Sequence, residues 1–114
     1  MEPISIIDRR EIEFDGKALI SPIAGSLQRA RTIGLPALRP MRIGFSPQTR
    51  EIRVEYDTHA AVWVASDRLG ALLVAYCVRA RIPISRQAEK DIRIATSSVF
   101  LTFATHFADM PATW

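Results

Sequence analysis

The segment from Ser66 to Arg81, SDRLGALLVAYCVRAR, constrains the fold most, because its apolar residues recur at helical spacing. The spaced residues are Leu69, Leu72, Leu73, Tyr76 and Ala80. Val74 and Val78 make the opposite side of this helix apolar as well. A helix that is apolar nearly all round must be covered by other elements. Because a serine and an aspartate favour its start and a proline at position 83 favours its end, the sequence predicts a central buried helix.

Residues 41–56 carry a two-residue period that is typical of antiparallel strands with one solvated face. Alternation runs from 41 to 45, stops at a loop, SPQT, and resumes from 52 to 56. This pattern predicts a hairpin. The next segment, 59–65, suits either a third strand or the start of the central helix, and we favour the strand.

Two further hairpins are predicted, one near each end of the chain. In residues 11–20, the dipeptide Asp15-Gly16 tolerates the positive dihedral angles of a two-residue turn. In residues 92–103, alternation stops at a Thr-Ser-Ser segment and then resumes. The face of the first hairpin that should pack on the core carries Ile12, Phe14 and Leu19.

A second, shorter helix is predicted over residues 22–33. Ser21 can cap this helix, Pro22 suits its first position, and Gly34 is typical of a helix end. Its apolar stripe is narrow, so it should bury less surface than the central helix.

The order of these elements defines the predicted fold class. Hairpins in place of crossover connections favour an α+β fold, in which a mainly antiparallel sheet packs against the central buried helix and the second, shorter helix. The chain has 114 residues, which is a usual length for one domain. We predict a single domain over 1–108 and a loose C-terminal tail over 109–114.

Composition is typical of a small soluble protein. The chain is 48% hydrophobic and 24% charged, as ordinary globular domains are. No segment approaches the roughly 20 apolar residues of a membrane-spanning helix, and the N-terminus lacks the apolar stretch of a secretory signal. The one cysteine, Cys77, cannot form an internal disulfide, which fits a reducing compartment. We therefore expect a cytoplasmic protein with no membrane partner.

Arginine dominates the basic residues. Only Lys17 and Lys90 are lysines among 15 basic residues, and no acidic residue occurs between positions 18 and 50. Since the planar guanidinium binds phosphates and carboxylates in a bidentate way, one hypothesis is an anion-binding or nucleic-acid-binding surface. Its candidate residues are Arg29, Arg31, Arg39, Arg42 and Arg53. Against it, base composition alone can raise arginine content, and the aromatic residues needed for base stacking occupy core positions of the predicted pattern.

Catalytic patterns are sparse. Asp57 lies two residues from His59 and could orient it as a general base, although both residues also suit a turn. The chain has 2 histidines and 1 cysteine, without the spacing of a structural metal site, and it has no glycine-rich phosphate loop. We predict no catalytic residue, metal or cofactor, and keep an enzyme that uses Asp57 and His59 as an alternative.

The C-terminal segment VFLTFATHF is uncharged and apolar on both faces, because Phe100 faces away from its apolar neighbours. Such a strand lies inside a sheet, which we favour, or at an edge that a partner covers. In the second case a homodimer interface would contain Val99, Phe100, Leu101, Phe103 and Trp114, with Trp63 as another anchor. The leading hypothesis is a non-enzymatic accessory or interaction module that self-associates, most simply as a dimer.

Overall fold

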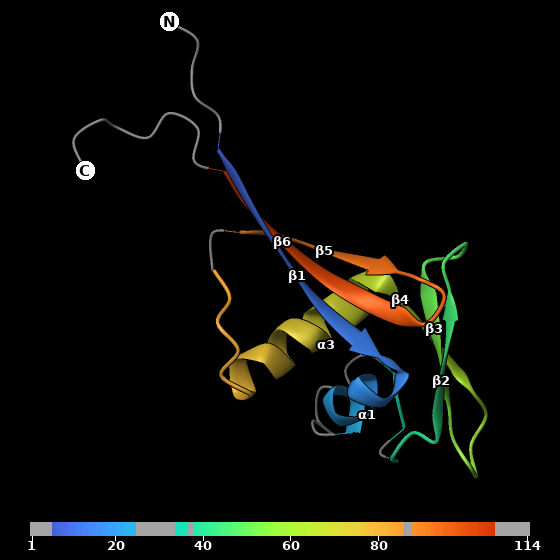
Figure 1. The fold of residues 1–114 in the computed structure, drawn as a ribbon. Coiled ribbons are helices and arrows are strands. Elements are labelled where there is room, and N and C mark those ends of the chain that lie inside the picture. The colour runs from blue at the N-terminus through green and yellow to red at the C-terminus, as the bar shows by residue number, and fades with distance from the viewer. Residues whose placement is uncertain (1–5, 25–33, 37, 86–87, 107–114) are drawn as a thin grey trace, which may run out of the picture.

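A computed structural model describes residues 6–24, 34–36, 38–85 and 88–106. Within them the chain forms two antiparallel three-stranded sheets and two helices, which confirms the predicted α+β class (Figure 1). Figure 1 shows α3 (Ser66–Arg79) lying across one face of the sheet that contains the first and last strands of the fold, with the other sheet at one end of the molecule. The predicted tail, 109–114, lies outside the described residues.

The first sheet, sheet A, contains β1 (Ile7–Asp15), β6 (Ser98–His106) and β5 (Glu89–Ile94) in that order. The hairpin predicted near the C-terminus is confirmed as β5 and β6, with Ile92 opposite Leu101. Because β1 and β5 flank β6 on both sides, the preference for an internal position of this uncharged strand is also confirmed.

The second sheet, sheet B, contains β2 (Arg42–Ser46), β3 (Glu51–Glu55) and β4 (Val62–Ala65) in that order. The predicted hairpin is β2 and β3, and the strand preferred for 59–65 forms over its last four residues. Arg50, the last residue of the turn between β2 and β3, has a φ of 56°. The meander therefore has three strands, with β4 at one edge.

The central helix is confirmed as α3, although it is not buried on all sides. Leu69, Leu72, Leu73 and Cys77 face the core, whereas Val78 is 64% exposed. The expectation of an apolar opposite side buried by other elements is therefore wrong at Val78. Gly70 allows α3 to approach β5 closely, because a Cβ there would lie 3.2 Å from Cγ1 of Ile92.

The hairpin predicted around Asp15-Gly16 is wrong. Strand β1 ends at Asp15, and α1 (Gly16–Ala24) begins at the next residue. Asp15 caps this helix, because its Oδ1 accepts a hydrogen bond of 2.8 Å from the N–H of Ala18. The same dipeptide suits both a tight turn and a helix start. Because β1 pairs with β6 and not with residues 17–20, the chain is free to form α1 after Asp15.

The second predicted helix begins earlier than expected. It spans Gly16–Ala24, so Pro22 lies inside it and Leu19 is a buried helical residue, not a strand residue. The remainder of the predicted range, 25–33, lies outside the described residues.

One core joins the two sheets and the two helices. Its buried apolar residues form a single cluster that includes members from every described strand and helix. Phe14 of β1 meets Tyr76 of α3 edge to face, with 6.3 Å between ring centroids. This common core fixes the direction in which the outer face and the free edge of sheet B point.

Candidate functional site

Trp63 is the large aromatic side chain that sheet B leaves on its surface. Alternation along β4 turns the side chain of Val64 into the core, and that of Trp63 to the opposite face, where it is 53% exposed. The expectation that aromatic residues lie at core positions is therefore wrong for Trp63. A half-exposed tryptophan on a regular strand is a strong candidate for a contact residue.

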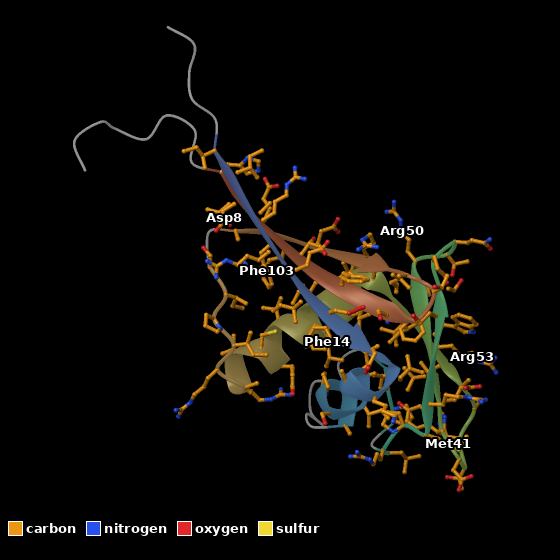
Figure 2. All side chains as sticks on the ribbon, viewed as in Figure 1. Asp8, Phe14, Met41, Arg50, Arg53 and Phe103 are labelled. Atoms are coloured by element: carbon orange, nitrogen blue, oxygen red, sulfur yellow. The ribbon has the colours of Figure 1, made fainter. Side chains whose placement is uncertain are left out.

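The surface around this side chain is the Trp63 face, defined by Arg42, Gly44, Glu51, Arg53, Glu55 and Trp63. Gly44, Arg53 and Trp63 lie side by side across the three strands. The guanidinium carbon of Arg53 lies 6.0 Å from the indole centroid, a loose cation–π contact. In Figure 2, Arg53 points away from the body of the molecule.

Charges on the Trp63 face are paired across the strands. The Nε of Arg42 donates a 2.5 Å hydrogen bond to Oε2 of Glu55, and Nη2 of Arg53 lies 3.8 Å from Oε1 of the same carboxylate. The Arg42 hydrogen bond is the main reason that the pKa of Glu55 falls below its usual value. With Glu51 included, two arginines and two glutamates make this face electrically balanced.

Three of the five arginines predicted to bind anions lie in the described part of the chain. Arg42 and Arg53 share the Trp63 face, whereas Arg39 is exposed in the segment before β2. Arg29 and Arg31 lie outside the described residues. Among the three candidates that the structure describes, it brings Arg42 and Arg53 together, beside acidic partners.

The outer edge of β4 carries backbone groups that have no hydrogen-bond partner among the described residues. The N–H of Ser66 donates to the carbonyl of Arg50 at 3.0 Å, and these residues lie opposite each other in the register of β3 and β4. Since bonded pairs alternate along an antiparallel ladder, Val62 and Val64 also bond to β3. The N–H and C=O of Trp63 therefore point to the open edge.

Ala65 shares part of this orientation. The N–H of Ala65 faces outward, while the C=O of Ala65 begins the hydrogen bonding of α3 as its N-cap. In the part of the chain that the structure describes, no backbone or side-chain hydrogen bond reaches these outward groups.

The residues predicted for an interface on β6 lie mostly inside the protein. Val99, Leu101 and Phe103 belong to the core, and Trp114 lies outside the described residues. Phe100 is half-buried on the outer face of sheet A, beneath the guanidinium of Arg93 at 4.1 Å from the ring centroid. Because β6 has neighbours on both sides, it offers no edge for pairing.

Sheet A has a shallow hollow on its outer face that sequence reasoning missed. Its volume is about 770 Å³, and it lies over the small residues Thr102 and Ala104 of the central strand. Longer charged side chains from both flanking strands line it, including Glu89, whose Oε2 lies 3.8 Å from Nε2 of His106. Small residues at alternate positions of β6 were the available signal. The lining carries charges of both signs and is open to solvent.

The proposed pair Asp57 and His59 lies in the exposed loop before β4. Nδ1 of His59 is 2.8 Å from the carbonyl oxygen of Ala60, so this nitrogen is engaged by the backbone. The ring also meets Tyr56 edge to face, at 5.9 Å between centroids. No hydrogen bond between Asp57 and His59 occurs in the described structure. The loop thus gives this pair no catalytic geometry.

Buried polar groups in the core are poorly suited to chemistry. Burial raises the pKa of the Cys77 thiol, which keeps it in the protonated, less nucleophilic form. Burial also raises the pKa of Tyr56, whose hydroxyl has no hydrogen-bond partner among the residues that the structure describes.

No group of three or more His, Cys, Asp or Glu side chains among the described residues is placed to hold a metal ion. None of the described helices is long and apolar enough to cross a membrane.

Comparison with known proteins gives no relationship. No family model matches the chain, no curated protein is detectably similar to it, and no solved structure matches its fold. The function must therefore be argued from the Trp63 face and the edge of β4.

Proposed function

We propose that this protein is a small, non-enzymatic, cytoplasmic interaction module that associates with itself through sheet B. The observation that carries the proposal is the exposed indole of Trp63 on a regular strand. Tryptophan is the side chain most enriched among residues that dominate binding energy, since it buries a large area at low entropic cost. The proposed role of such a module is binding, and no chemical reaction is assigned to it.

The charge pattern of the Trp63 face supports a second copy as the partner. A surface that packs on its own copy cannot carry a large net charge, because like charges would then face each other. Arg42 and Arg53 are offset by Glu51 and Glu55, so the face meets this condition. A nucleic-acid surface, in contrast, is expected to be strongly basic.

Sedimentation across micromolar to millimolar concentration tests this proposal. We expect a reversible monomer–dimer equilibrium in the unmodified protein. Trp63→Ser should raise the dissociation constant about 30-fold, as expected for loss of a central contact residue. Val78→Ser is the matched control, because Val78 is also exposed but lies on α3. A protein that stays monomeric at every concentration refutes self-association.

Anion or nucleic-acid binding is the second candidate, and the contact between Arg53 and Trp63 favours it. An arginine beside an exposed indole can stack on a base while contacting phosphate. Binding of labelled single-stranded DNA or RNA should then weaken steeply between low and high salt. Arg53→Ser should weaken it further, and binding that is unchanged in this variant refutes a site built on Arg53 and Trp63.

A further inference from the structure

We infer that two copies associate by antiparallel pairing of β4 with β4 across a two-fold axis at Trp63, which merges the two B sheets into one six-stranded sheet. This inference rests on the proposed self-association and adds its geometry. A second copy of this chain occupies the open edge of β4. Three independent features of β4 support it.

The first feature is the sequence of the edge. Residues 61–65 read Ala-Val-Trp-Val-Ala, which is the same in both directions. Pairing about a two-fold axis at Trp63 places this residue opposite its own copy, Val62 opposite Val64, and Ala61 opposite Ala65. Each side chain therefore meets one of its own kind, so neither face of the joined sheet has a mismatch in size.

The second feature is the supply of hydrogen bonds. The outward N–H and C=O of Trp63 match those of Trp63 in the other copy, because a residue on the axis forms a reciprocal bonded pair. If the extended backbone of β4 continues to Ala61 in the dimer, the outward N–H of Ala65 donates to the C=O of Ala61 in the other copy. The reverse bond of this pair, from the N–H of Ala61 to the carbonyl of Ala65, is not part of this supply, because α3 already uses that carbonyl.

The third feature is the absence of any protecting charge. Proteins usually defend an open strand edge with charged residues, proline or a covering element. Val62–Ala65 contains no charged residue and no proline, and the main packing partners of β4 among the described elements are β3 and α3. By contrast, β1, which also lies at a sheet edge, presents Asp8, Arg9, Arg10 and Glu11.

The exposed indole gains a partner in this dimer. Directly opposite residues share one face of the sheet, so the two Trp63 rings lie next to each other on the outer face. Arg53 of each copy flanks its own indole, which gives a continuous row from Arg53 through both rings to the second Arg53. Each indole ring thereby covers part of the surface that the other Trp63 side chain exposes in the monomer.

Ala65→Pro is the sharpest single test of the edge. Ala65 has a φ of −72°, close to the fixed value of proline, and its N–H serves no bond within the described chain. The monomer should therefore tolerate proline, with a thermal midpoint within a few degrees of the parent. Ala65→Ser is the matched control, because serine keeps the N–H. We expect at least about a 10-fold rise in the dissociation constant for proline and no rise for serine.

Disulfide trapping tests the register. In a Cys77→Ser background, Trp63→Cys places two cysteines opposite each other across the axis, with Cα atoms about 5.5 Å apart, within disulfide reach. Ala65→Cys is the control, because its two copies would lie about 13 Å apart along the joined strands. At saturating concentration under mild oxidation, we expect covalent dimer from the first variant and monomer from the second.

The outcomes separate this inference from the proposal on which it rests. A strictly monomeric parent protein overturns both. A parent dimer that persists with Ala65→Pro, and that Trp63→Cys does not trap, overturns edge pairing while self-association stands. Equal trapping by both cysteine variants overturns the register about Trp63. Loss of the dimer in Ala65→Pro, together with selective trapping through Trp63→Cys, supports both.

Discussion

Strands β6 and β4 contain no Asp, Glu, Lys or Arg, yet they lie in opposite positions in their sheets. β6 is the central strand of sheet A, and its inward residues Val99 and Leu101 are fully buried. β4 is an edge strand of sheet B, with Trp63 half-exposed and one side of its backbone open. An uncharged strand needs a hydrogen-bonded neighbour at each of its two edges, because an unpaired edge without charges promotes aggregation. The fold provides this cover for β6, and we propose that a second copy provides it for β4.

The largest expected effect comes from the covered strand. Leu101→Ala removes a side chain that is fully buried in the core. The lost burial and the remaining cavity should lower the free energy of unfolding by about 3–5 kcal/mol. Urea unfolding followed by circular dichroism, at concentrations where the protein is monomeric, measures this change. A loss below about 1 kcal/mol would mean that Leu101 of β6 is not packed at the centre of the core.

The next largest effect is expected for a substitution in the edge strand β4, which should change association and not stability. Trp63→Lys gives β4 the kind of charge that protects the edge strand β1. Two ammonium groups would face each other across the dimer axis, so we expect association to be lost throughout the micromolar range. Unfolding of the monomer should change by no more than about 0.5 kcal/mol, because the side chain lies on the surface. Sedimentation and urea unfolding together check both parts, and a lysine variant that still dimerises contradicts the comparison.

The smallest expected effect concerns the charges beside β4. The pKa of Glu55 is lowered in the folded protein, chiefly by the hydrogen bond from Arg42. The pair therefore contributes stability above the unfolded carboxylate pKa of about 4.3, and this contribution is lost as pH falls through the lower folded value. Glu55→Gln should make the thermal midpoint slightly less sensitive to acidification from pH 7 to pH 3. An unchanged or steeper acid dependence contradicts this pairing.

Local patterns in the sequence predict much of this fold because they depend on near neighbours. Alternation identifies the β2–β3 and β5–β6 hairpins, and apolar spacing identifies α3. The Asp15-Gly16 turn fails because the same two residues also suit a helix start. The competing interaction, pairing of β1 with a strand more than 80 residues later, has no local pattern that would reveal it.

The candidate site was only partly predictable. The strand containing Trp63 could be identified, but its short length left open which of its faces would be buried. Val62 and Val64 were the available signal, because two β-branched residues that flank a tryptophan place it on the opposite face. The palindrome at 61–65 is also visible in the sequence, yet it gains meaning only when β4 is known to be an edge strand.

Amide hydrogen exchange measured at several protein concentrations tests the central claim most directly. The outward N–H groups of Trp63 and Ala65 have no partner in the described monomer and should exchange quickly at low concentration. We predict that their protection rises with concentration, in step with the fraction of dimer, whereas amides of the central strand β6 stay protected throughout. Exchange at Trp63 and Ala65 that stays fast when the protein is fully dimeric would contradict edge pairing through β4.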